Sequence, residues 1–81
     1  MPKAHDVGAE IRYYAAIATA YDLAKQYEQA IRYFDRALNT AAKHPETGFQ
    51  YISIWGKAKA LLRLGRIDEA ELTCLGFLYQ P

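Results

Sequence analysis

The pattern that most restricts how this chain can fold lies in residues 27–42. Apolar residues recur there at steps of three and four positions, which is the period of one face of an α-helix. Ala30 and Ala37 stand on either side of Phe34 on that face. Another helix can come close at the alanines while the ring fills the space between them. We therefore expect a helix packed between other helices, with the apolar positions Tyr27, Ala30, Ile31, Phe34, Ala37, Leu38 and Ala41.

A first helix is expected before this stretch, joined to it by a very short connection. Asp6 can accept a hydrogen bond from a free backbone N–H of the first turn, and Glu10 lies near the positive end of that helix. The helical pattern continues to about Lys25, so that Lys25 and Gln26 form the connection. So short a connection makes the two helices antiparallel. The expected apolar face consists of Ile11, Tyr14, Ile17, Ala18 and Tyr21.

A third helix is expected after a break at Pro45. Proline disfavours helical geometry in the residue before it, so the second helix should end near His44. Thr47 and Gln50 have the spacing of a capping box, which predicts a helix that starts there. Gly65 can adopt the left-handed conformation that ends a helix. The expected apolar residues of this helix are Tyr51, Ile54, Trp55, Ala58, Leu61 and Leu62.

The last stretch of the chain repeats an earlier one. The segment Ile67-Asp68-Glu69-Ala70 has the same apolar-acid-polar-alanine form as Tyr27-Glu28-Gln29-Ala30, with Ala70 standing 40 positions after Ala30. Each segment follows a short break after a helix, and the acidic residues suit a helix start. The sequence therefore predicts an internal repeat of one helical hairpin. The fourth helix should run towards Pro81 with Ile67, Ala70, Leu72, Cys74, Leu75 and Leu78 as its apolar residues.

Length and composition limit the class of protein. A chain of 81 residues makes at most one domain, which buries only about 60% of its unfolded surface. The apolar fraction of 52% argues against disorder. No apolar run approaches the roughly 20 residues that span a bilayer, and residues 1–6 lack the apolar core of a secretory signal, so we expect a cytoplasmic protein without membrane contact. The single cysteine, Cys74, excludes an internal disulfide and is expected to be a small core residue.

The motifs of enzymes are absent from the sequence. It contains no glycine-rich phosphate loop, no paired histidines at metal-binding spacing, and no serine or cysteine with a neighbouring base. We therefore expect no catalytic residues, no cofactor and no metal site.

The residues resemble those of the tetratricopeptide repeat family. In that family, aromatic, large and small residues of a helix A meet an Ala, aromatic, Ala pattern on a helix B. The matching positions of the first hairpin are Tyr14, Ile17, Ala18, Tyr21, Ala30, Phe34 and Ala37, with Pro45 beyond them. The second hairpin matches at Ala58, Leu61, Gly65 and Ala70, but departs from the pattern at Lys57, Cys74 and Phe77.

The resemblance implies an architecture and a class of function. The fold would be all-α, with four helices in two stacked antiparallel hairpins that form a short tetratricopeptide-like solenoid. Residues 1–81 would form one domain, with one repeat at about 9–44 and another at about 47–81. The spacing of about 40 exceeds the usual 34 residues, as in the longer-helix subclass of peptide-sensing bacterial regulators and kinesin light chains. Such a fold implies a non-catalytic scaffold or module that binds a protein or peptide.

The resemblance also implies where a peptide would bind. The groove positions of the family correspond here to Arg12, Thr19, Asp22, Trp55, Lys59 and Arg63. In this interpretation Trp55 is an apolar anchor, while Lys59 and Arg63 bind acidic groups of the peptide. The alternative is that Trp55 packs between the hairpins and that the basic residues are ordinary solvated surface. The carboxylate clamp of chaperone-binding members is not supported, because its positions hold Ala15, Thr19 and Gly56.

The last helix is unusually apolar for the end of a solenoid, whose outer face is normally polar. We expect it to mediate self-association into a homo-oligomer. The alternative is that the sequence is a fragment of a larger tetratricopeptide regulator whose next repeat would cover this helix. The expected oligomer interface consists of Leu72, Leu75, Phe77, Leu78 and Tyr79.

A nucleic-acid-binding role for the third helix is the remaining alternative. That helix and the residues just after it hold several basic side chains, and its aromatic side chains could stack on bases. The net charge of +1 and the absence of a helix-turn-helix signature disfavour this interpretation. The basic residues in question are Lys57, Lys59, Arg63 and Arg66.

Overall fold

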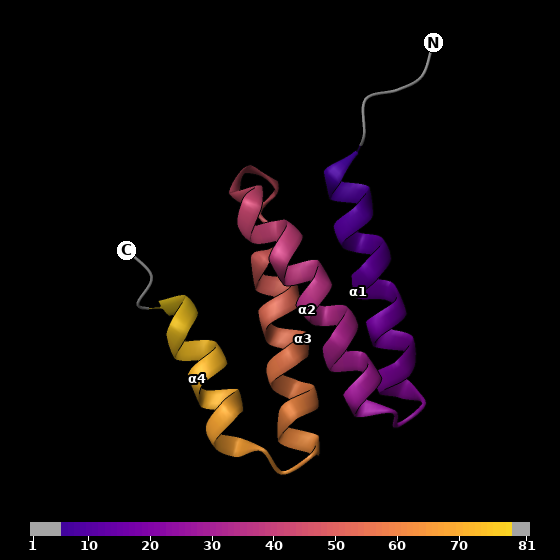
Figure 1. Cartoon of the computed structure of the whole chain (residues 1–81), viewed down its shortest axis with the longest axis vertical. Coiled ribbons are helices and arrows are strands. Elements are labelled where there is room, and N and C mark those ends of the chain that lie inside the picture. The colour runs from indigo at the N-terminus through magenta and orange to yellow at the C-terminus, as the bar shows by residue number, and fades with distance from the viewer. Residues whose placement is uncertain (1–5, 79–81) are drawn as a thin grey trace.

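The structure is a computed structural model that describes residues 6–78, with the side chains of residues 6–76. This part of the chain contains four α-helices, one short 3-10 helix and no β-strand, which confirms the all-α prediction. The helices run alternately up and down and lie side by side, with α1 at one edge and α4 at the other (Figure 1). Their bounds are α1 Val7–Leu23, α2 Tyr27–Lys43, η1 Pro45–Thr47, α3 Gln50–Arg63 and α4 Ile67–Leu78.

The expected cap of the first helix and the short connection after it are confirmed. The side chain of Asp6 accepts a hydrogen bond from the backbone N–H of Ala9 at 3.1 Å, which caps α1. Three residues, 24–26, connect α1 to α2. As expected, α2 packs between α1 and α3.

The two hairpin turns have the same backbone geometry. The N–H of Gln26 donates to the carbonyl of Tyr21 at 2.9 Å, and the N–H of Arg66 donates to the carbonyl of Leu61 at 2.9 Å. These are the long hydrogen bonds of a Schellman motif, in which the preceding residue adopts a left-handed conformation. That residue is Lys25 in the first turn, with φ of 64°, and Gly65 in the second, with φ of 80°. The two turns therefore repeat one conformation at an offset of 40 residues.

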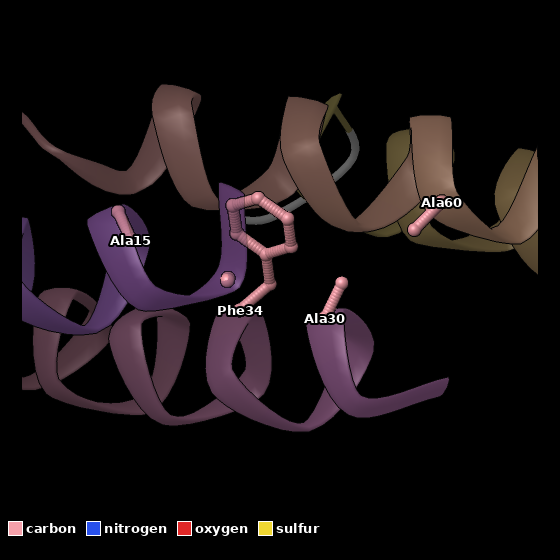
Figure 2. Packing of buried hydrophobic residues seen from close by; sticks show 5 residues of the cluster. Ala15, Ala30, Phe34 and Ala60 are labelled. Carbon is pink, nitrogen blue, oxygen red and sulfur yellow. The ribbon is translucent and has the colours of Figure 1, made fainter. Parts of the chain in front are cut away.

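The core centres on Phe34, whose ring extends from α2 towards α3 (Figure 2). Ala30 and Ala60 lie beside the ring, where the small side chains bring α2 close to α3. Gly56 provides the space for the ring itself, because a Cβ atom at this position would overlap Cε1 and Cζ of Phe34. All the apolar positions expected for the second helix are buried or half-buried, which confirms the prediction for that helix.

The apolar residues expected on α3 do not all face the core. Tyr51, Trp55 and Leu62 are exposed, whereas Ala58 and Leu61 are buried as expected. The reason is that small residues fill the face of α3 that packs closely against the first hairpin. The three large side chains lie on other faces of the helix. The buried small residues are Ser53, Gly56 and Ala60.

The capping box at Thr47 was also wrong. Residues Pro45–Thr47 form a 3-10 helix that ends at Gly48 in the left-handed region, with φ of 70°, and α3 begins only at Gln50 with Phe49 as its N-cap. The Thr47 hydroxyl instead donates to the carbonyl of His44 at 2.8 Å and accepts from the N–H of Phe49 at 3.4 Å. Thr47 therefore stabilises the turn rather than the helix.

The start of α4 is held by an ion pair. Arg66, just before the helix, donates hydrogen bonds to Glu69 from Nε at 2.5 Å and from Nη2 at 2.8 Å. These hydrogen bonds, with the positive charge of Arg66, lower the pKa of Glu69. The pair therefore adds to stability at neutral pH, and this contribution is lost as the pH falls through the lowered pKa. Because both side chains are exposed, the contribution is small.

Two substitutions test the shared turn geometry. Lys25→Gly should raise the free energy of unfolding by about 0.5–1 kcal/mol, because a left-handed conformation is unfavourable for a residue with a Cβ atom. Gly65→Lys should lower it by a similar amount for the same reason. Urea denaturation followed by circular dichroism measures both. A loss of stability in Lys25→Gly would contradict the assigned conformation.

A second test concerns the space beside Phe34. Gly56→Ala should lower the free energy of unfolding by about 1–3 kcal/mol, because the overlap with the ring outweighs the roughly 1 kcal/mol gain in helix propensity. The matched control is the same substitution in a Phe34→Leu background, where the smaller side chain should reduce the cost. Equal costs in the two backgrounds would show that the ring does not occupy this space.

Candidate functional site

Asp22 is the buried charge on which the candidate site is built. It lies in the last turn of α1, and only 4% of its surface is exposed. Nη1 of Arg63, on α3, donates a hydrogen bond to Oδ2 of Asp22 at 2.5 Å. The other carboxylate oxygen, Oδ1, is buried and has no hydrogen-bond partner among the described residues. The ion pair therefore joins the two hairpins across 41 residues of sequence and fixes the end of α3 against α1.

Lys59 links this ion pair to an exposed tryptophan. Its Nζ atom lies 4.0 Å from Oδ2 of Asp22 and 4.3 Å from the centroid of the Trp55 ring. The spacing of four residues between Trp55, Lys59 and Arg63 explains this alignment, because it places them along one side of α3. The guanidinium carbon of Arg63 lies 5.8 Å from the centroid of the Tyr27 ring. We call this group of five residues the Asp22 cluster.

The surface of the Asp22 cluster combines an apolar platform with a positive charge. The Trp55 side chain is 66% exposed, so it does not pack between the hairpins. Arg63 is already paired with Asp22, whereas the Lys59 ammonium approaches Asp22 without forming a hydrogen bond. Lys59 is therefore the member whose N–H groups can bind an added carboxylate. Tyr27 was missed in the sequence because it was assigned to the core of the hairpin.

The remaining predicted groove residues lie outside the Asp22 cluster. Thr19 is exposed on α1, and its hydroxyl donates to the carbonyl of Ala15 at 2.8 Å within the same helix. Arg12 lies ten residues before Asp22, or about 15 Å along the helix axis. Its guanidinium carbon is 5.9 Å from the ring centroid of Phe49. The structure thus brings together Asp22, Trp55, Lys59 and Arg63, four of the six predicted groove residues.

The basic residues near α3 do not form one open positive surface. Nζ of Lys57 lies 2.7 Å from a carboxylate oxygen of Asp35, on α2. Arg63 and Arg66 are each paired with a carboxylate as well. Three of the four basic residues considered for nucleic-acid binding are therefore neutralised within the chain, which weakens that alternative.

The structure describes only part of the expected oligomer interface. Leu72 is 68% exposed on α4 and Leu75 is half-buried. The side chains of Phe77 and Leu78, and the whole of Tyr79, lie outside the described residues. Cys74 is exposed rather than part of the core, which corrects the expectation for this residue. The residue of α4 that is buried against α3 is Ala70, which contacts Ala58 and Leu61.

Residues 6–78 contain neither a metal-binding cluster nor a membrane-spanning helix. In that range no three side chains of histidine, cysteine, aspartate or glutamate come together in a way that could hold a metal ion. None of the helices described there is both long and apolar enough to cross a membrane.

The Asp22–Arg63 pair predicts an asymmetry between two substitutions. Arg63→Ala should lower the free energy of unfolding by about 1–3 kcal/mol, because it leaves a buried carboxylate without its hydrogen-bond donor. Asp22→Ala should cost less, because the half-exposed guanidinium of Arg63 can bind water instead. Denaturation of both variants by urea measures the difference. A larger cost for Asp22→Ala would contradict the assigned burial.

Comparison with known proteins identifies the first hairpin. Residues 11–44 match the family model of the tetratricopeptide repeat, and this range covers most of α1 and all of α2. Neither the curated proteins nor the solved structures contain a match to the chain. The family match does not include α3 and α4, so the second repeat and its spacing stay a prediction from their own residues. The first hairpin is therefore similar to a tetratricopeptide repeat.

Proposed function

We propose that this chain is a non-catalytic interaction module that binds a peptide segment of another protein at the Asp22 cluster. The tetratricopeptide repeat supports the general class, because such repeats are protein-interaction units. The observation that carries the proposal is the exposed ring of Trp55, with the Lys59 ammonium 4.3 Å from its centroid. Large aromatic side chains contribute a large share of the energy at protein interfaces when a partner covers them.

The chemistry of the Asp22 cluster indicates what the peptide should contain. Trp55 would contact an apolar or aromatic side chain, and Lys59 would bind a nearby carboxylate of the same peptide. Arg63 has a different proposed role from the one expected from the sequence. Because it is paired with Asp22, it would position the end of α3 rather than bind the peptide itself.

The proposed peptide class can be tested by selection from a displayed peptide library. Peptides that bind the wild-type chain should combine a large apolar residue with a neighbouring acidic residue. Trp55→Ala should weaken their binding by about 30-fold or more, which corresponds to a hot spot of about 2 kcal/mol. Titration calorimetry of one selected peptide measures the loss.

A matched control is available on α1. Tyr13 is 64% exposed, nearly the same as Trp55, but lies about 13 Å along α1 from Asp22. Tyr13→Ala should therefore leave peptide binding within about twofold of wild type. Lys59→Gln should reduce the preference for acidic peptides and the dependence of binding on salt. Equal losses in Tyr13→Ala and Trp55→Ala would place the binding surface elsewhere.

We also propose self-association through α4 as a second function. The observation that favours it is the exposure of Ile67 and Leu72 on this helix, at 63% and 68%. Apolar side chains exposed on a short helix at the edge of the fold favour contact with another surface. This surface is separate from the Asp22 cluster, so the two proposed functions can be tested independently.

A further inference from the structure

The side of the molecule between α2 and α4 contains an open groove. The helices α2 and α4 both pack against α3, and α4 lies at the edge of the fold (Figure 1). A cavity of about 610 Å³ lies between them, with residues of α3 as its floor. Its apolar lining includes Leu38 of α2, Ile54 of α3 and Leu72 of α4. No residue of the Asp22 cluster lines this cavity, which is therefore a second surface.

Gly76 lines the same groove, and no contact within the part of the chain that the structure describes explains a glycine there. A glycine inside a helix costs about 1 kcal/mol relative to alanine. At Gly56 the ring of Phe34 explains this cost, because the ring occupies the space of a Cβ atom. At Gly76 a Cβ atom would have no neighbour within 4 Å among the described residues. A glycine in the wall of a groove allows the backbone of another helix to approach closely.

Charges without an ion-pair partner in the described part of the chain differ in sign between α4 and the end of α2. The helix α4 contains three acidic residues and no basic residue. Two of them, Asp68 and Glu71, have no ion-pair partner among residues 6–78. Lys43, in the last turn of α2, is exposed, follows the groove residue Ala42, and also has no such partner in that range. A helix with the charges of α4 would therefore be attracted to Lys43, at the end of α2 that borders the groove.

We propose that this groove receives α4 from a second copy of the chain, antiparallel to the α4 that forms its wall. The inference rests on the proposed self-association and names the surface that receives the helix. In a two-fold dimer each copy supplies one groove and one helix, so the contact is made twice. The antiparallel order places the acidic halves of the two α4 helices at opposite ends of the contact between the two copies. Asp68 of each copy then lies near the groove end that carries Lys43.

The test is the solution mass of the full chain, measured by sedimentation equilibrium over a wide range of concentration. The wild-type chain should form a reversible dimer. Gly76→Gln should weaken the dimer by about tenfold or more, because the longer side chain prevents the close approach of the second helix. Glutamine forms helices better than glycine, so the helix content seen by circular dichroism should not fall. The matched control is Ala20→Gln, at an exposed alanine of α1, which should leave the dimer unchanged.

A charge exchange tests the antiparallel order. Lys43→Asp should weaken the dimer by repulsion from the acidic half of the second α4. Adding Asp68→Lys to the same chain should restore the affinity, because the two charges are then exchanged. A double variant that dimerises no better than Lys43→Asp alone would overturn the proposed order of the helices.

The outcomes separate the inference from the proposal on which it rests. A wild-type chain that stays monomeric at every concentration would overturn both the self-association and the groove. A dimer that Gly76→Gln does not weaken would overturn the groove alone, and would leave self-association through another face of α4. Loss of the dimer in Gly76→Gln, with the dimer retained in Ala20→Gln, is the result that supports the groove.

Discussion

The contact between the Phe34 ring and the backbone of Gly56 holds the two hairpins together. The ring can reach α3 only because Gly56 has no side chain, and the neighbouring alanines Ala30 and Ala60 bring the two helices close on one side of it. A chain of this size has few other large buried side chains, since among the described residues Ile11 and Leu61 are the large apolar ones that are almost fully buried. The position of α3 therefore depends mainly on this contact.

The candidate site depends on the same position of α3. Once α3 packs against α2, its last turn lies beside the end of α1, and Arg63 reaches the buried carboxylate of Asp22. That ion pair leaves Lys59 next to Trp55 on the exposed side of the helix. The core and the site thus both follow from the packing of α3, which turns Gly56 and Ala60 inwards and leaves Trp55 exposed to solvent. The groove between α2 and α4 arises on the other side of α3, where the packing leaves α4 at the edge of the fold.

Much of the fold could be predicted from the sequence because helical period, caps and breaks are local signals. The period of residues 27–42, the cap at Asp6 and the turn at Gly65 all follow from neighbouring residues. The inner face of α3 could not be predicted in this way. Large apolar side chains such as Tyr51 and Leu62 do not mark this face, because close helix packing selected the small face that contains Gly56. The Asp22–Arg63 pair joins residues 41 positions apart, so only the tertiary packing reveals that Arg63 is already paired.

The most direct test of this account is a nuclear Overhauser measurement between the ring protons of Phe34 and the α protons of Gly56. Strong cross-peaks are expected between them, because the ring occupies the space next to the glycine backbone. The absence of these cross-peaks in a folded chain, with the Phe34 ring instead in contact only with α1, would contradict it. In that case neither the position of α3 nor the Asp22 cluster that depends on it would stand.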